Sequence, residues 1–234
     1  MKAYGFVFAR GGSKGIKNKN VQEINGISLV GHAVKVGIDT PEIDKVFVSS
    51  DCNVILGEGE KYGAVPIKRP AYLATDYASE LEAWKHAIEF LFKNGLSCEC
   101  FVSLPPTSPL RQVSDISEAI KCFEANQKEK LVFAVTESSL HPGFNLVRKD
   151  EISGSICRYD QTMSIVKRRQ DAQKAYQLTT VVYAVPPLQI GTLESLWQLE
   201  NTSIEIPIQR SIDIDTQIDL DFCRFLKSHN NNDR

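Results

Sequence analysis

Short apolar runs alternate along this chain with stretches in which apolar residues recur every third or fourth position. The short runs are typical of buried strands, and the longer spacing is typical of helices packed on one face. Strands are expected over Ala3–Ala9, Lys45–Ser49, Ala64–Lys68, Cys100–Leu104, Leu131–Thr136 and Thr179–Val185. Helices are expected over Leu29–Ile38, Val54–Tyr62, Leu81–Phe92, Ile116–Phe123 and about Ile218–Lys227. This alternation predicts an α/β fold with a mostly parallel sheet covered on both faces.

The alternation is interrupted between residues 138 and 175, where His141-Pro142-Gly143 and scattered charges replace the regular pattern. This segment predicts either a lobe that leaves the core and carries oligomer contacts or a long surface loop. The chain is otherwise predicted to form one domain over residues 1–234, because 234 residues can bury one sizeable core.

Charge, apolar length and cysteine spacing limit the kinds of molecule and cellular setting that this chain is expected to have as partners. The formal net charge of -2 gives no overall positive field, so no nucleic acid is expected as a partner. The first apolar run ends at Arg10, too short to cross a bilayer, so it is interpreted as a buried strand and no membrane partner is expected. The six cysteines lack the spacing of a disulfide scaffold or a paired metal motif, which predicts reduced thiols in a cytoplasmic protein.

The most informative stretch follows the first strand and runs from Ala9 to Asn20, reading Ala-Arg-Gly-Gly-Ser-Lys-Gly-Ile-Lys-Asn-Lys-Asn. Gly11, Gly12 and Gly15 leave the backbone free to curl around an anion with its N–H groups pointing inward. Four cations add positive charge at the carboxyl end of a strand, where open α/β sheets bind ligands, so the loop predicts a triphosphate site. Neither the Walker nor the dinucleotide-binding signature matches, and a solvated basic turn is the alternative.

The same stretch resembles the opening signature of the N-acylneuraminate cytidylyltransferases, also called CMP-sialic acid synthetases. The resemblance implies a three-layer, Rossmann-like nucleotidyltransferase fold of the GT-A type. It implies that CTP and an acidic nine-carbon 2-keto sugar react to give a CMP-sugar and pyrophosphate. It also implies that Arg10, Ser13 and Lys19 bind the CTP phosphates, and that Asn20 contacts the nucleotide near its base and ribose. Lys17 remains the alternative to Lys19 as the catalytic cation.

The segment after the third strand, Arg69 to Ser79, reads Arg-Pro-Ala-Tyr-Leu-Ala-Thr-Asp-Tyr-Ala-Ser and resembles a second element of the family. The resemblance implies that Arg69 and the backbone of Ala78 and Ser79 surround the cytosine. Asp76 and Ser79 also suit the N-cap of the helix that follows, and for Ser79 both roles stay open.

The segment Leu104 to Arg111 reads Leu-Pro-Pro-Thr-Ser-Pro-Leu-Arg and resembles the loop that borders the family's sugar pocket. It implies that Thr107, Ser108 and Arg111 contact the sugar. Pro105 stands where the family has glutamine, so that side-chain hydrogen bond is absent and a tight turn is favoured at this position.

A fourth element resembles the family between Lys167 and Tyr176, although Gln173 replaces a proline there and Thr179 lies where asparagine is common. A guanidinium group can bind a planar carboxylate through two hydrogen bonds. Arg169 is therefore the candidate for the carboxylate of the acidic sugar, with Gln170 as a second sugar contact. A plain surface charge on the lobe is the alternative for Arg169.

Near the end of the chain, the segment Ser211 to Leu220 reads Ser-Ile-Asp-Ile-Asp-Thr-Gln-Ile-Asp-Leu. In an extended segment this alternation places Asp213 and Asp215 on one side. Neighbouring carboxylates repel each other unless a hard cation joins them. The segment resembles the family's acidic element, which implies that the pair holds Mg²⁺ bridged to a CTP phosphate. The polar face of an edge strand is the alternative, and Asp219 is expected to cap or support the last helix.

Several alternatives stay open. The departures at Pro105, Gln173 and Thr179 make legionaminic or pseudaminic acid fit as well as sialic acid. A 3-deoxy-manno-octulosonate cytidylyltransferase is disfavoured by the Ile-Lys-Asn-Lys-Asn ending of the first loop. Proteins of another class would be a nucleotide-sugar-binding module without transfer activity or an inactive paralogue. The resemblance further implies a homodimer formed through the lobe and a role in cell-surface polysaccharide biosynthesis, whether capsule, lipopolysaccharide or flagellar glycan.

Overall fold

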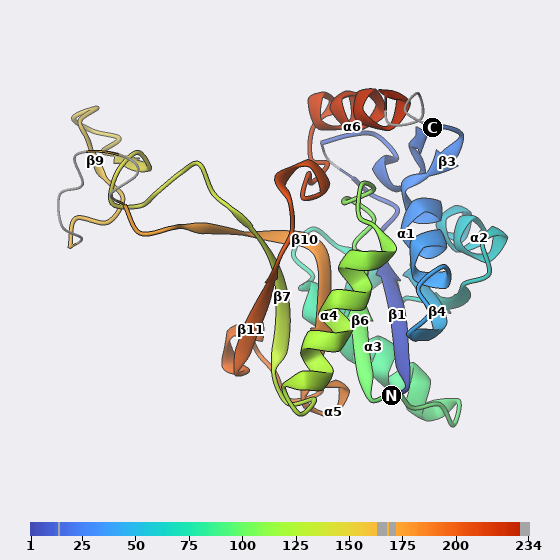
Figure 1. Ribbon diagram of the computed structural model, residues 1–234. Coiled ribbons are helices and arrows are strands. Elements are labelled where there is room, and N and C mark those ends of the chain that lie inside the picture. The colour runs from blue at the N-terminus through green and yellow to red at the C-terminus, as the bar shows by residue number, and fades with distance from the viewer. Residues whose placement is uncertain (14, 163–167, 169–171, 230–234) are drawn as a thin grey trace.

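The computed structural model describes residues 1–13, 15–162, 168 and 172–229. A seven-stranded sheet with the order β11-β7-β10-β6-β1-β4-β5 forms its centre (Figure 1). Its strands are β1 (Ala3–Phe8), β4 (Ile43–Ser50), β5 (Val65–Lys68), β6 (Cys100–Ser103), β7 (Leu131–Glu137), β10 (Tyr176–Val185) and β11 (Asn201–Glu205). Within this described sheet β10 alone runs antiparallel to its neighbours, so the predicted mostly parallel sheet is confirmed.

Helices cover both faces of the sheet, which confirms the predicted three-layer architecture (Figure 1). On one face lie α1 (Leu29–Ile38), α2 (Asn53–Lys61) and α4 (Val113–Ala125), and on the other lie α3 (Glu80–Lys93) and α5 (Pro187–Ile190). Strand β1 shows why both faces are apolar. Ala3 and Val7 belong to the core under α1, whereas Phe6 and Phe8 belong to the core under α3, because successive side chains point to opposite faces.

The last helix, α6 (Gln217–His229), lies over the edge of the sheet at which the parallel strands end (Figure 1). It packs on the hairpin of β2 (Glu23–Ile24) and β3 (Ile27–Ser28) through a separate apolar cluster that includes Ile214 and Leu220. Asp219 Oδ2 accepts from Thr216 N at 2.7 Å, and Thr216 Oγ1 accepts from Asp219 N at 3.4 Å. This reciprocal cap confirms the predicted role of Asp219 at the start of the helix.

The chain leaves the sheet after β7 and returns to it at β10, and the described part of the intervening lobe projects away from the core (Figure 1). It contains a hairpin of β8 (Val147–Lys149) and β9 (Ile156–Arg158). Val147 and Ile156 are exposed on this hairpin. The expected role of the lobe in dimerisation stays a prediction.

The sheet differs in two places from the strands expected from the sequence. Strand β11 is not predicted because, of its residues, Ile204 alone is buried and the rest are polar. Strand β10 begins at Tyr176, three positions before the expected Thr179, since its first residues pair with β7 beyond the buried core.

The remaining helical segments are short. 3-10 helices occupy Lys19–Val21, Ala71–Ala74, Leu196–Gln198 and Ile208–Arg210. Of the helices described, none combines the length and apolar character that crossing a bilayer requires.

Candidate active site

A pocket of about 450 Å³ lies where the parallel strands end, the place at which open α/β sheets bind ligands. Segments far apart in the chain meet in its lining. They are the first loop with Arg10, Ser13, Gly15, Lys19 and Asn20, the segment after β5 with Arg69, Ala78, Ser79 and Glu80, the turn Pro105–Thr107 after β6, and Thr180 and Asp215. The first loop and the acidic segment, the two strongest signals in the sequence, therefore border one cavity.

The first loop is held in place by polar contacts of its own. Asn20 is buried, and its Nδ2 donates to the carbonyl oxygen of Arg10 at 3.0 Å. Gly11 N donates to Asp51 Oδ1 at 2.9 Å, so this N–H already has an acceptor, and Gly12 lies in open space. At Gly15 a Cβ atom would lie 2.4 Å from the carbonyl oxygen of Asp215, so the close approach of these two segments requires glycine.

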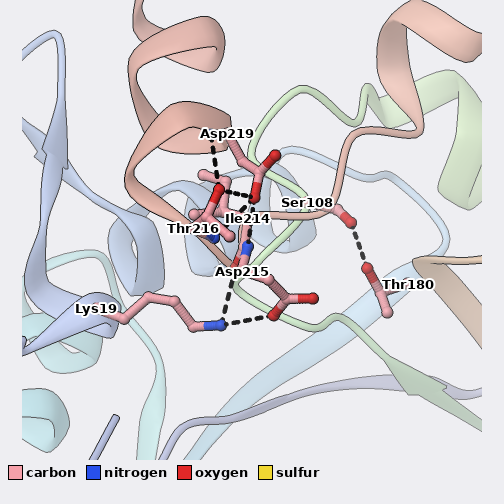
Figure 2. Close-up of polar contacts among 7 residues, drawn as sticks. All are labelled: Lys19, Ser108, Thr180, Ile214, Asp215, Thr216 and Asp219. Carbon is pink, nitrogen blue, oxygen red and sulfur yellow. Dashed lines mark hydrogen bonds and ion pairs between the residues drawn. The ribbon is translucent and has the colours of Figure 1, made fainter. Parts of the chain in front are cut away.

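Lys19 joins the first loop to the acidic segment (Figure 2). Its Nζ donates to the carbonyl oxygen of Ile214 at 2.8 Å and to Asp215 Oδ1 at 3.2 Å. The Lys19 side chain is 17% exposed and lines the pocket, whereas Lys17 is exposed and does not line it. Of the two candidate cations, the geometry therefore favours Lys19.

Residues 211–215 have no regular secondary structure, and the predicted alternation is seen only at Ile214, which is buried, and Asp215, which is exposed, because Ile212 and Asp213 are both half-buried. Ile214 is fully buried and its N–H donates to Thr107 O at 2.9 Å, which attaches the segment to the loop after β6. Asp213 is half-buried, and its Oδ1 is buried without a hydrogen-bond partner among the described residues. Asp215 is exposed in the pocket.

These two carboxylates suit a hard divalent cation, because an orphaned buried carboxylate oxygen requires a proton donor or a metal. Within the described ranges, no group of three or more histidine, cysteine, aspartate or glutamate side chains could hold a metal. A cation at Asp213 and Asp215 would therefore need further oxygen ligands from a phosphate or water, as Mg²⁺ commonly does.

Arg69 and Glu80 stand at opposite ends of the segment between β5 and α3. Arg69 is buried, and its Nε and Nη2 have no hydrogen-bond partner in the described part of the chain. Burial lowers the pKa of Arg69, and the carboxylates of Asp51 and Glu80 oppose this shift. Glu80 is open to the pocket on one side, yet desolvation by the surrounding protein raises its pKa. A hydrogen bond from Trp84 Nε1 to Glu80 Oε1 at 3.2 Å and the charge of Arg69 act in the opposite direction.

Ser79 caps α3, and its predicted contact with cytosine stays a prediction. Its hydroxyl accepts from Leu81 N at 3.2 Å, which confirms the predicted N-cap of α3, and the residue also lines the pocket beside Ala78. Asp76, the other proposed cap, instead pairs with Arg10.

The loop after β6 presents Pro105, Pro106 and Thr107 to the pocket, while Ser108 and Arg111 lie behind it. Arg111 is buried and donates from Nε to Ser108 O at 3.0 Å and from Nη2 to Pro105 O. Burial lowers the pKa of Arg111 to about 9, and nearby carboxylates oppose the shift. Arg111 thus holds the turn that the prolines begin. Sugar contacts by Thr107, Ser108 and Arg111 stay predictions.

Thr180 is a pocket residue that the sequence pattern does not single out. Its Oγ1 lies 2.7 Å from Ser108 Oγ, so it links β10 to the loop after β6 (Figure 2). Its neighbour Thr179 is buried, and Oγ1 of Thr179 donates to Ala134 O at 2.9 Å. The departure from asparagine at Thr179 therefore serves the contact between β10 and β7.

Arg169 and Gln170, the predicted sugar contacts on the lobe, lie outside the described residues, as does Lys167. Nearby, Gln173 lines a second pocket of about 390 Å³ at the base of the lobe together with His141 and Asn145. This second pocket is separate from the one that contains Lys19 and Asp215.

Comparison with known proteins agrees with the family resemblance found in the sequence. A family model described as cytidylyltransferase matches residues 5–205. The chain is 29% identical over 229 residues to pseudaminic acid cytidylyltransferase of Campylobacter jejuni strain 81-176, covering 97% of this chain and 96% of the relative. It is also 29% identical over 227 residues to CMP-N,N'-diacetyllegionaminic acid synthase of Campylobacter jejuni strain NCTC 11168, covering 96% of this chain and 94% of the relative.

A solved structure supports the fold. CMP:2-keto-3-deoxy-manno-octonic acid synthetase in complex with CTP superposes with a TM-score of 0.73 at 16% identity, covering 98% of this chain and 100% of that chain. This likeness concerns the three-layer architecture, which agrees with the fold predicted from the sequence.

Proposed function

The chain belongs to the cytidylyltransferase family, and on that basis we propose that it transfers CMP from CTP to an acidic nine-carbon 2-keto sugar. Family membership makes it a nucleotidyltransferase, the enzyme class that the first loop and the acidic segment predict. A nucleotide-sugar-binding module without transfer activity does not explain why Lys19 and Asp215 meet at the pocket.

The contact between Lys19 and Asp215 is the observation that carries this proposal. It brings the first loop to Asp215 of the acidic segment, and Asp215 lines the pocket together with Arg10 and Ser13. In the proposed reaction the anomeric hydroxyl of the sugar attacks the α-phosphorus of CTP and pyrophosphate leaves. Arg10 and Lys19 stabilise the negative charge that develops on the α-phosphate and the leaving group.

We propose Mg²⁺ as the cofactor, held by Asp213 and Asp215. When bound there, the ion supplies positive charge to the phosphates and lowers the pKa of an attached hydroxyl. The support is the orphaned Oδ1 of Asp213 next to a pocket-facing Asp215, together with the preference of Mg²⁺ for one or two carboxylates and substrate phosphates.

For the sugar, we propose a bacterial nonulosonic acid of the pseudaminic or legionaminic kind. Relatives named for each of these acids match this chain over nearly its whole length at 29% identity. Pro105 lines the pocket and has no side-chain donor, which agrees with a sugar other than N-acetylneuraminate. The octulosonic acid alternative is not better supported, since the relative named for it shares the fold at 16% identity.

We further propose that the protein acts as a cytoplasmic homodimer joined through the lobe. Exposed apolar side chains on the lobe, namely Leu140, Val147, Ile152 and Ile156, support an interface there. The six free cysteines and the use of CTP support a reducing, cytoplasmic setting.

Pyrophosphate release in the presence of Mg²⁺ tests the function directly. Each of the four common nucleoside triphosphates is offered with a panel of neuraminic, legionaminic, pseudaminic and octulosonic acids. We expect release with CTP together with pseudaminic or legionaminic acid. Release only with octulosonic acid would contradict the proposed sugar, and release with ATP but not CTP would contradict the proposed nucleotide.

A further inference from the structure

The acidic segment is held at the pocket through the backbone of Ile214, which lies between Asp213 and Asp215. The N–H group of Ile214 donates to Thr107 O at 2.9 Å, and its carbonyl oxygen accepts from Lys19 Nζ at 2.8 Å (Figure 2). The segment has no regular secondary structure, so individual contacts of this kind decide where the two carboxylates lie. The carbonyl of Thr107 is therefore one of the points that fix the acidic pair.

Thr107 lies in a turn with few backbone donors. Pro105, Pro106 and Pro109 have no N–H group, so the turn cannot close on hydrogen bonds from these residues. Carbonyl groups in the protein interior nevertheless need donors. A turn of this composition therefore depends on side chains to hold its carbonyls in place.

The Arg111 side chain supplies such donors. Its Nε donates to Ser108 O at 3.0 Å, and its Nη2 donates to Pro105 O. These two carbonyls precede and follow Thr107 in the chain, so the planar guanidinium joins the ends of the short stretch that contains the Thr107 carbonyl. A second link holds the same stretch, because Ser108 Oγ lies 2.7 Å from Thr180 Oγ1 on β10 (Figure 2).

Arg111 lies behind the pocket and not in its lining. Thr107 is among the described residues that line the pocket, whereas Arg111 is not among them and is 6% exposed. The third guanidinium nitrogen of Arg111, Nη1, is buried as well. Burying a guanidinium group is costly, and hydrogen bonds to two carbonyl oxygens offset part of that cost. These observations favour a role through the turn over a direct contact with a substrate.

We propose that Arg111 is a positioning residue for the metal site and not a sugar contact. It fixes the Thr107 carbonyl, and that carbonyl fixes Ile214 between the carboxylates of Asp213 and Asp215. This inference rests on the proposed function and on Mg²⁺ as the proposed cofactor. It replaces the sugar contact that the family resemblance implies for Arg111.

Three roles for Arg111 make different predictions. A positioning residue changes the Mg²⁺ requirement of the CTP-bound protein. A sugar contact changes the KM for the sugar and leaves the Mg²⁺ requirement unaltered. A merely structural residue lowers the midpoint of urea unfolding, but the protein that stays folded keeps the wild-type values of both other quantities.

Calorimetric titrations with CTP at a series of fixed Mg²⁺ concentrations test the positioning role without turnover, since no sugar is present. They give the Mg²⁺ concentration at which half of the full tightening of CTP binding is reached. Arg111→Met keeps a long side chain but has no donor. In this variant the half-tightening concentration is expected to rise by about 10-fold, the lower end of the range for partners behind a metal ligand, because Arg111 acts through the turn.

Arg111→Lys keeps the positive charge but loses the planar fork, so it cannot join both carbonyls. A rise of about threefold is expected, the effect of one ordinary hydrogen bond, and this variant carries the test if Arg111→Met does not fold. Arg224→Met is the matched control, because Arg224 Nε also donates to a backbone carbonyl, Glu23 O at 3.0 Å, but outside the turn. It is expected to keep the wild-type Mg²⁺ requirement.

The KM for the sugar, from pyrophosphate release at saturating CTP and Mg²⁺, is expected to stay within about twofold of wild type in both Arg111 variants. An unchanged Mg²⁺ requirement in every folded Arg111 variant overturns the proposal. A raised sugar KM then assigns Arg111 to the sugar, and a lowered urea midpoint alone assigns it to the fold. Wild-type CTP binding that does not respond to Mg²⁺ overturns the proposed cofactor together with this inference, and failure of the wild-type protein to bind CTP overturns the proposed function.

Discussion

Arg10 and Asp76 form an ion pair, with 2.5 Å between Nη1 and Oδ1, that joins the first loop to the segment preceding α3. The cation expected to bind phosphate is thus already held by a carboxylate. For Arg10 to bind a triphosphate, its ion pair with Asp76 must break, or the Arg10 guanidinium must contact Asp76 and the phosphate at the same time. Both side chains are about one-third exposed, 34% and 36%, so the pair is weak and breaks readily.

Asp76→Asn is therefore expected to tighten CTP binding by about two- to fivefold, because Arg10 no longer leaves a charged partner. Isothermal titration with CTP measures this change. Asp39→Asn, which removes a similar exposed pair with Lys35 on α1, is the control and should leave the affinity unchanged. Weaker CTP binding by Asp76→Asn would show that Asp76 supports the bound nucleotide instead.

Lys19→Ala is expected to lower kcat by about 100-fold or more, since a positioned charge on the transferring phosphate contributes a factor of this order. Lys17→Ala is the control, because Lys17 is exposed and does not line the pocket. Steady-state pyrophosphate release measures both variants. A large loss in Lys17→Ala with little change in Lys19→Ala would reverse the assignment.

Replacing either acid of the pair is expected to raise the Mg²⁺ concentration needed for half-maximal activity. Asp213→Asn and Asp215→Asn remove one negative charge each, and carboxylate charge is what a hard cation prefers. A Mg²⁺ titration at saturating CTP gives the shift. Asp221→Asn, an exposed change on α6, should keep the wild-type requirement. An unaltered requirement in both pair variants would remove the metal from these residues.

Gly15→Ala is expected to lower both stability and activity. The new Cβ atom would lie 2.4 Å from the carbonyl oxygen of Asp215, which is backbone and cannot rotate away. Such overpacking costs about 1–3 kcal/mol, visible as a lower midpoint in urea unfolding. Gly12→Ala is the stability control, because no atom lies within 4 Å of the added Cβ. A wild-type midpoint for Gly15→Ala would place the first loop farther from the acidic segment.

His32 makes the contact between α1 and α6 sensitive to acid. Burial and then the charge of Lys227 lower its pKa to about 4, although its hydrogen bond to the Ile24 carbonyl acts in the opposite direction. Nδ1 of His32 lies 3.0 Å from Nζ of Lys227, so the neutral ring accepts there and donates from Nε2 to Ile24 O. The unfolded chain takes up a proton near pH 6.5, before the folded protein does.

Stability is therefore expected to fall as the pH drops from about 6.5 to about 4, by on the order of 2 kcal/mol from this group. Urea unfolding at several pH values measures the loss. His32→Gln keeps a donor and an acceptor without titrating, so its unfolding should depend less on pH over this range. His229→Gln, at the end of α6, should keep the wild-type dependence.

The sequence predicts the helices and strands of this protein well where apolar residues recur at the regular spacing of a buried face. Helix α1 spans Leu29–Ile38 as expected, and the other predicted elements overlap observed ones. Glycine and charge in the first loop and the paired aspartates are local signals, so they identify two sides of the pocket without knowledge of the fold. Their meeting at Lys19 and Asp215 follows from where the strands end.

What the sequence does not predict depends on neighbours from distant segments. Glu80 looks like an ordinary first-turn acid until the fold places it beside Arg69 at the pocket. Arg111 is a motif residue whose burial behind the turn no local pattern reveals. Thr180 acquires its role only because β10 inserts antiparallel between β6 and β7, a topology that apolar periodicity does not specify.

The bond between Lys19 and Asp215 joins residues 196 positions apart. During translation, the ribosome therefore makes the first loop long before its acidic partner exists. Throughout that interval the nascent chain lacks the contact on which the proposed function rests, so we expect it to leave CTP unused. On the proposed roles of Lys19 and Asp215, catalytic competence is expected only after the acidic segment has been made, so a chain halted before Asp215 is expected to stay inert even if its central sheet has already formed.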